Sequence, residues 1–99
     1  MTAEPESTED GRYVVIKGRR WRATDPKIPE QRDAELRSIL MDWRREVKRT
    51  SSAPEARAGV QATKVALGER GTPWWEQSDD ERRRRWETEL PRPGGERKS

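Results

Sequence analysis

The sequence predicts a small, mostly helical α+β protein: an N-terminal two-stranded β-hairpin packed on an antiparallel pair of helices, with a third helix towards the C-terminus. Three observations predict this fold. Apolar residues recur at helical spacing between residues 29 and 50. β-branched and aromatic residues flank a Lys-Gly dipeptide at residues 17 and 18, as in a hairpin. Two Ser-x-x-Glu patterns, starting at residues 52 and 78, are typical of helix N-termini.

The composition limits the chain to one small domain with a thin core. Of the 99 residues only 28% are hydrophobic and 41% are charged, and there are five Trp but no Phe. Because 22 basic residues are offset by 19 acidic ones, the pattern favours a salt-bridged surface over a self-repelling coil. We expect residues 11–90 to form the domain, residues 1–10 to be a disordered acidic tail, and residues 91–99 to be a second disordered tail.

The hairpin is predicted over residues 12–24. A two-residue turn at Lys17 and Gly18 gives one register. Its cross-strand pairs are Ile16 with Arg19, Val15 with Arg20, Val14 with Trp21, and Tyr13 with Arg22. Val14, Ile16 and Trp21 then share one face. Because a two-stranded hairpin is not stable alone, we expect this face to dock on the helices.

The first helix is predicted over residues 29–50, with Pro29 at its first position. On a helical wheel its apolar side chains fall within about 60° of Leu36. They are Leu36, Ile39, Leu40, Trp43 and Val47.

The second helix is predicted over residues 53–67, with Ser52 and Glu55 forming a capping box. Its inward stripe is Ala56, Val60, Thr63 and Leu67. These mostly small residues let the two helices approach closely, and Gly59 predicts a tight contact. Gly68 then ends the helix.

A loop over residues 71–77 carries Trp74 and Trp75, and we favour a core role for them over ligand stacking. The third helix is predicted over residues 79–90, opened by a capping box at Ser78. Its apolar residues are only Trp86 and Leu90, so we expect it to be the least stable element.

Two stretches resemble a known family. Residues 10–30 read DGRYVVIKGRRWRATDPKIPE, and residues 64–76 read KVALGERGTPWWE. Both are similar to a family of small actinobacterial and proteobacterial proteins, many of which carry the name biopolymer transporter Tol. A transporter component of that type requires a membrane-spanning segment, and the sequence has no run of about 18 apolar residues, so we take no transport function from the name. The resemblance covers about residues 10–76 and implies neither an activity nor catalytic residues.

The residue types present argue against an enzyme. The chain has no Cys and no His, which removes disulfides, thiolate chemistry and imidazole bases or ligands. Its glycines are isolated, so neither a phosphate loop nor a dinucleotide fingerprint is present. We expect no catalytic residue, no cofactor and no metal. The N-terminal residues lack the pattern of a signal peptide, so we expect a cytoplasmic protein without a membrane partner.

Two binding functions remain. We favour a non-enzymatic protein-interaction or structural module, a monomer or weak dimer, because Trp and Arg are enriched in binding hot spots. Its contact residues are Trp74, Trp75 and Trp86, and we expect some Trp, with Trp74 or Trp86 as the first choices, to be exposed in the monomer or buried only in a dimer.

The alternative is a nucleic-acid-binding protein. Residues 11–27 contain six basic residues and one acidic residue, and a basic β-ribbon can enter a major groove. The candidate contact residues are Tyr13, Lys17, Arg19, Arg20, Arg22, Arg37, Arg44, Arg45 and Lys48. The run of four arginines from Arg82 to Arg85 is a second candidate.

Overall fold

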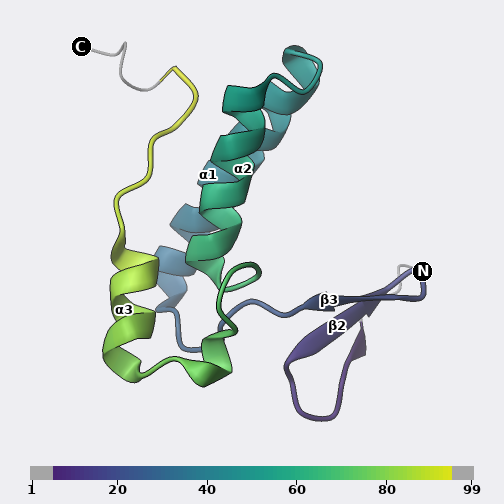
Figure 1. The fold of residues 1–99 in the computed structure, drawn as a ribbon, viewed down its shortest axis with the longest axis vertical. Coiled ribbons are helices and arrows are strands. Elements are labelled where there is room, and N and C mark those ends of the chain that lie inside the picture. Colours follow the sequence, from purple (N-terminus) through teal and green to yellow (C-terminus); the bar gives the residue numbers. More distant parts are fainter. Residues whose placement is uncertain (1–5, 95–99) are drawn as a thin grey trace.

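The structure, a computed structural model, describes residues 6–94 and confirms the predicted α+β, mostly helical class. Its elements are β1 (Glu6–Ser7), β2 (Tyr13–Ile16), β3 (Arg19–Arg22), α1 (Glu30–Arg49), α2 (Pro54–Leu67), the 3-10 helix η1 (Trp74–Glu76) and α3 (Asp79–Glu87). α1 and α2 lie side by side as an antiparallel pair, α3 packs near one end of the pair, and the β-hairpin projects away from it (Figure 1).

The predicted stripe of α1 forms the core. Leu36, Ile39, Leu40 and Trp43 are buried, while Val47 is partly buried. Small residues of α2 are buried against them, among them Ala56, Gly59 and Thr63. A Cβ atom placed on Gly59 would overlap the indole ring of Trp43, so the predicted tight contact is confirmed. Gly68 ends α2 in the left-handed conformation, also as predicted.

The N-termini of the two later helices differ in how they are capped. Ser78 caps α3 through a complete capping box: its hydroxyl accepts the Glu81 N–H, and the Glu81 carboxylate accepts the Ser78 N–H. The capping box predicted at Ser52 is wrong, because the N-cap of α2 is Ala53 and no side chain caps it. The short link between α1 and α2 requires Ser52 to adopt a φ of 70°, which is not a capping conformation.

α3 ends at Glu87, three residues before the predicted end at Leu90. Pro91 disfavours helical conformation at the residue before it, which shortens the helix. The chain then runs back along the helix pair (Figure 1). The Trp43 indole N–H donates to the Pro91 carbonyl at 2.9 Å, and Leu90 packs on the core. Part of the predicted C-terminal tail therefore lies against the domain, and residues 95–99 lie outside the described residues.

The hairpin has the predicted register at all four cross-strand pairs. The predicted disordered tail, however, contains β1, which pairs with the free edge of β2 and makes a three-stranded sheet. An unpaired strand edge leaves backbone N–H and C=O groups available for such pairing. The prediction for residues 1–10 is thus wrong at Glu6–Ser7, and residues 1–5 lie outside the described residues.

The prediction that this face of the hairpin docks on the helices is also wrong. Ile16 and Trp21 are 42% and 41% exposed, so the face that they share with Val14 is not packed on the helices. The opposite face holds the hairpin instead, because the Tyr13 and Trp75 rings pack in a T-shaped arrangement with their centroids 5.6 Å apart. Two further contacts secure the base of the hairpin: Arg22 donates to the Gly71 carbonyl at 2.7 Å, and the Trp74 indole donates to the Ala23 carbonyl at 2.9 Å.

Candidate anion-binding groove

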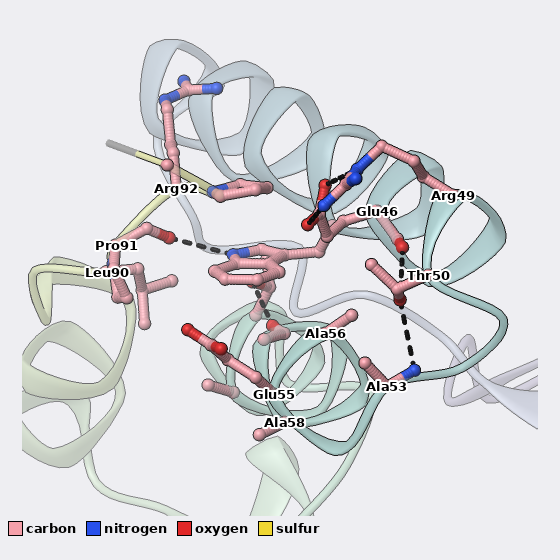
Figure 2. A pocket seen from close by; sticks show the side chains of 16 residues that line it. Glu46, Arg49, Thr50, Ala53, Glu55, Ala56, Ala58, Leu90, Pro91 and Arg92 are labelled. Carbon is pink, nitrogen blue, oxygen red and sulfur yellow. Dashed lines mark hydrogen bonds and ion pairs between the residues drawn. The ribbon is translucent and has the colours of Figure 1, made fainter. Parts of the chain in front are cut away.

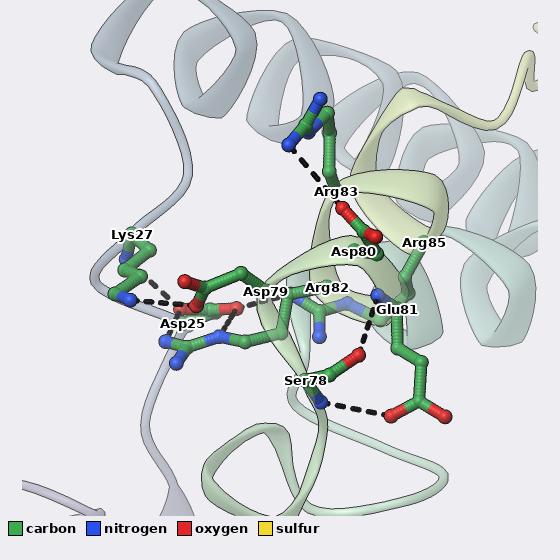
Figure 3. A network of polar contacts seen from close by, with 9 residues as sticks. All are labelled: Asp25, Lys27, Ser78, Asp79, Asp80, Glu81, Arg82, Arg83 and Arg85. Carbon is green, nitrogen blue, oxygen red and sulfur yellow. Dashed lines mark hydrogen bonds and ion pairs between the residues drawn. The ribbon is translucent and has the colours of Figure 1, made fainter.

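A buried ion network contains Arg82 and Arg85, two of the four consecutive arginines of α3. Asp25 is 2% exposed and lies between Arg82 and Arg85, both of which donate to its carboxylate (Figure 3). Asp25 also accepts the Lys27 N–H at 2.9 Å. Burial raises the Asp25 pKa, but the hydrogen bonds from Arg82 and Arg85 outweigh this effect, so the pKa lies below its usual value. Sequence reasoning missed this role of Asp25.

The indoles predicted to be contact residues are not the exposed ones. Trp74 and Trp86 are each 8% exposed, so the expectation of an exposed Trp is met by Trp21, at 41%, and is wrong for these two residues. Trp75 is half-buried against Tyr13, with the guanidinium of Arg12 4.8 Å from its ring centroid. The most exposed indole is that of Trp21, which the strand alternation places on the face that was expected to pack on the helices.

The outer face of the hairpin is occupied by its own contacts. Arg20 stacks over Tyr13 at 4.5 Å, and Arg22 lies over Trp75 while it donates to Gly71. These two arginines are therefore engaged and do not extend freely from the ribbon. Lys17 lies exposed in the turn, and Arg19 stacks on Trp21 at 4.9 Å.

A groove of about 540 Å³ separates the inner face of the hairpin from the helices. One wall is apolar and aromatic and consists of Val14, Ile16 and Trp21. The remaining lining comes from the hairpin exit, α1, α2 and the turn after α2. These residues are Arg22, Ala23, Thr24, Arg37, Arg44, Lys64, Glu69 and Arg70.

The electrostatics of the groove are strongly positive. Among residues 6–94 its lining includes five cationic residues, of which Arg22 directs its guanidinium to Trp75, and one carboxylate, Glu69. The Glu69 carboxylate already accepts the Thr24 hydroxyl at 2.6 Å. Desolvation lowers the pKa of Lys64, and the charges of Arg70 and Arg44 lower it further, against the opposite effect of Glu69. The ammonium of Lys64 lies 6.0 Å from the Trp21 ring centroid. An anion bound here would relieve the repulsion among these cations.

The structure therefore brings together only some of the residues predicted to contact nucleic acid. Arg22, Arg37 and Arg44 line the groove, but Arg37 also pairs with Asp33 on its own helix. Arg45 pairs with Asp42 outside the groove, and Lys48 lies exposed farther along α1. Tyr13 lies on the opposite face of the hairpin. Two groove cations, Lys64 and Arg70, were not predicted, because the apolar face of the hairpin was expected to pack on the helices and leave no groove there.

A second cavity, of about 620 Å³, lies between the helix pair and the C-terminal segment (Figure 2). Small residues such as Ala53, Ala56 and Ala58 form much of its lining. Its charges are largely matched, since Arg49 pairs with Glu46 across 2.6 Å. This cavity offers neither excess charge nor an exposed aromatic ring, and the groove is the better candidate site.

Other kinds of site are not found in the part of the chain that the structure describes. Within residues 6–94 no three Asp, Glu, Cys or His side chains gather as a metal site, and no helix has the length and apolar character to cross a membrane. The chain matches no protein-family profile, no curated protein and no solved structure. The family resemblance of residues 10–30 and 64–76 therefore stays a prediction, and the function is argued from the geometry of the groove.

Proposed function

We propose that this protein is a non-enzymatic module that binds nucleic acid in the groove between the hairpin and the helices. One observation carries the proposal. The groove is lined by three cations, Arg44, Lys64 and Arg70, while Glu69, the carboxylate in its described lining, already accepts a hydrogen bond. Phosphate groups are the anions that such clusters of Lys and Arg attract, with an affinity that depends on salt.

The ion pairs of the domain support this reading. Those near the groove connect Arg37 with Asp33 and Arg45 with Asp42, and among residues 6–94 none of them reaches Arg44 or Lys64. The charge excess in the groove is thus local, although the net charge of the whole chain is only +3. A local excess is sufficient because charges farther away than about 10 Å are screened at 0.1 M salt.

The test is fluorescence anisotropy with a labelled duplex and with its separated strands, starting at about 50 mM salt, where phosphate contacts are strongest. The double variant Arg44→Ala with Lys64→Ala should weaken binding and flatten the dependence of log K on log salt by about two. The matched control is Arg83→Ala with Arg84→Ala, which removes two charges from exposed positions of α3. Absence of binding at about 50 mM salt, or an equal loss in the control, would refute the proposal.

A second candidate follows from the apolar wall of the groove. Val14, Ile16 and Trp21 present apolar surface beside the cations, which suits an acidic protein segment with one apolar anchor. A protein partner would then contact the groove through Trp21, and not through Trp74 or Trp86 as the sequence predicted. A glutamate-rich peptide that binds the wild type, loses binding in Trp21→Ala, and meets no competition from nucleic acid would support this candidate against the first.

A further inference from the structure

The most informative feature of the groove is the exposed indole beside the cations. Trp21 is 41% exposed on the apolar wall, and Lys64 lies 6.0 Å from its ring centroid. An aromatic ring and a cation at this separation match the two parts of one nucleotide, a flat base and a charged phosphate. Base stacking on aromatic side chains combined with a basic backbone track is the arrangement that single-stranded nucleic acid uses.

The size of the groove also distinguishes between forms of nucleic acid. Its volume, about 540 Å³, is typical of sites that enclose a small molecule and would hold one nucleotide. In a duplex the bases are already stacked on one another, so their faces are not available to an indole. The alternative of ribbon insertion into a major groove would use the outer face of the hairpin, where Arg20 and Arg22 are engaged with Tyr13 and Trp75.

From these observations we infer that the groove is a subsite for one unpaired nucleotide, whose base stacks on Trp21 and whose phosphate binds Lys64 with Arg44 or Arg70. This inference rests on the proposed function and narrows it to single-stranded ligands. The same chemistry is offered by a free mononucleotide and by one unit of a single strand, and the experiment separates these two sources.

The position of the cations is consistent with this subsite. Arg44 belongs to α1, Lys64 to α2 and Arg70 to the turn that follows α2, so three separate segments bring positive charge to the same wall. Val14, which pairs with Trp21 across the hairpin, extends the apolar surface beside the indole. The Arg19 guanidinium lies over the Trp21 ring at 4.9 Å, so a base that stacks on this indole replaces Arg19 there and keeps Lys64 within reach of its phosphate.

The experiment measures binding of a labelled ten-residue oligothymidylate and of a duplex of equal length by fluorescence anisotropy at low salt. The wild type should bind the single strand more tightly than the duplex. Trp21→Ala should weaken single-strand binding by about tenfold or more, while Trp21→Phe should keep most of it. Since Trp21 is largely on the surface, far-UV circular dichroism should show that both variants keep their helices.

A matched aromatic control is Trp86→Phe, which changes an indole in the core, outside the lining of the groove, and should leave affinity for the single strand unchanged. NMR titration with thymidine monophosphate forms the second arm. Saturable shifts at Trp21 and Lys64 would identify a free nucleotide as a sufficient ligand, and shifts only with the oligomer would identify a strand. Either result supports the subsite.

Three results would overturn the inference. Equal affinity for strand and duplex that Trp21→Ala does not change would refute the subsite and leave the proposed function standing. Absence of binding to both nucleic acids would refute the subsite and the proposed function together. Binding of a glutamate-rich peptide at Trp21 without any binding of the oligomer would assign the groove to a protein partner and refute both.

Discussion

Replacement of Asp25 by Ala tests the packing of the whole domain. The Asp25 side chain is fully buried, and the side chains of Arg82 and Arg85 are 10% and 8% exposed. Without the carboxylate, the nearly buried guanidinium of Arg82 loses the acceptor of both its hydrogen bonds, and that of Arg85 keeps only Ala66 and Gln77. Breaking such a network costs about 3–5 kcal/mol. For a domain of this size each kcal/mol lowers the melting temperature by about 4–8 °C, so we expect a fall of at least about 12 °C.

The assay is urea unfolding followed by circular dichroism, with Asp25→Asn as a second variant of the same shape. The amide keeps an oxygen for the Lys27 N–H but turns its own N–H groups towards the arginines, so it should destabilise the protein less than Ala does. The matched control is Asp79→Asn, which breaks the exposed pair with Lys27 and should have a much smaller effect. A loss below about 1 kcal/mol for Asp25→Ala would refute the buried-network reasoning.

The pH dependence of the same variants gives an independent check. The folded-state pKa of Asp25 is lower than its unfolded value near 3.8, so its contribution to stability is fully present above that pH. As the pH falls below about 3.8 and towards the folded pKa, the contribution is lost. The difference in unfolding free energy between wild type and Asp25→Asn should therefore be constant near neutrality and shrink in acid. A difference that grows in acid would contradict the assignment.

Three further predictions concern contacts made by single residues. Gly59→Ala should destabilise the protein by about 1–3 kcal/mol in thermal unfolding, because the methyl group overlaps the Trp43 indole; a gain in stability, as helix propensity alone predicts, would contradict the contact. Ser78→Ala should cost about 1 kcal/mol in urea unfolding through loss of the capping box, and an unchanged midpoint would argue against it. Trp75→Leu should release the hairpin, so that amide exchange of β2 and β3 accelerates while that of α1 and α2 does not; uniform acceleration would show that the hairpin is not a separate unit.

Local patterns predicted most of the secondary structure because their causes are local. The spacing of Leu36, Leu40 and Trp43 identified the buried face of α1, and the Lys17-Gly18 turn fixed the hairpin register at every pair. The Ser78 capping box likewise depends on residues within one turn. The prediction at Ser52 failed although its spacing was identical, because the length of the connection between α1 and α2 dictates the backbone there.

The candidate site was less predictable, since it depends on pairs of residues far apart in the chain. Asp25 and Arg82 are separated by 57 positions, and nothing near either one indicates that they meet. The four arginines of α3 read as one exposed run in the sequence. A helix with 3.6 residues per turn must nevertheless direct some of them inwards, and Arg82 and Arg85 are the two that reach Asp25.

The groove itself results from the way in which the hairpin is attached. If the face of Val14, Ile16 and Trp21 had packed on the helices, it would have covered Arg44 and Lys64, and no concave surface would remain. Trp75 contacts the opposite face instead, because Trp74, its neighbour in η1, is buried and donates to Ala23 at the hairpin exit. The pair of adjacent indoles thus positions the hairpin so that its apolar face stands across a gap from the basic helices. Trp74 and Trp75, two of the tryptophans predicted as contact residues, therefore act by holding the hairpin so that the groove stays open and Trp21 is exposed in it.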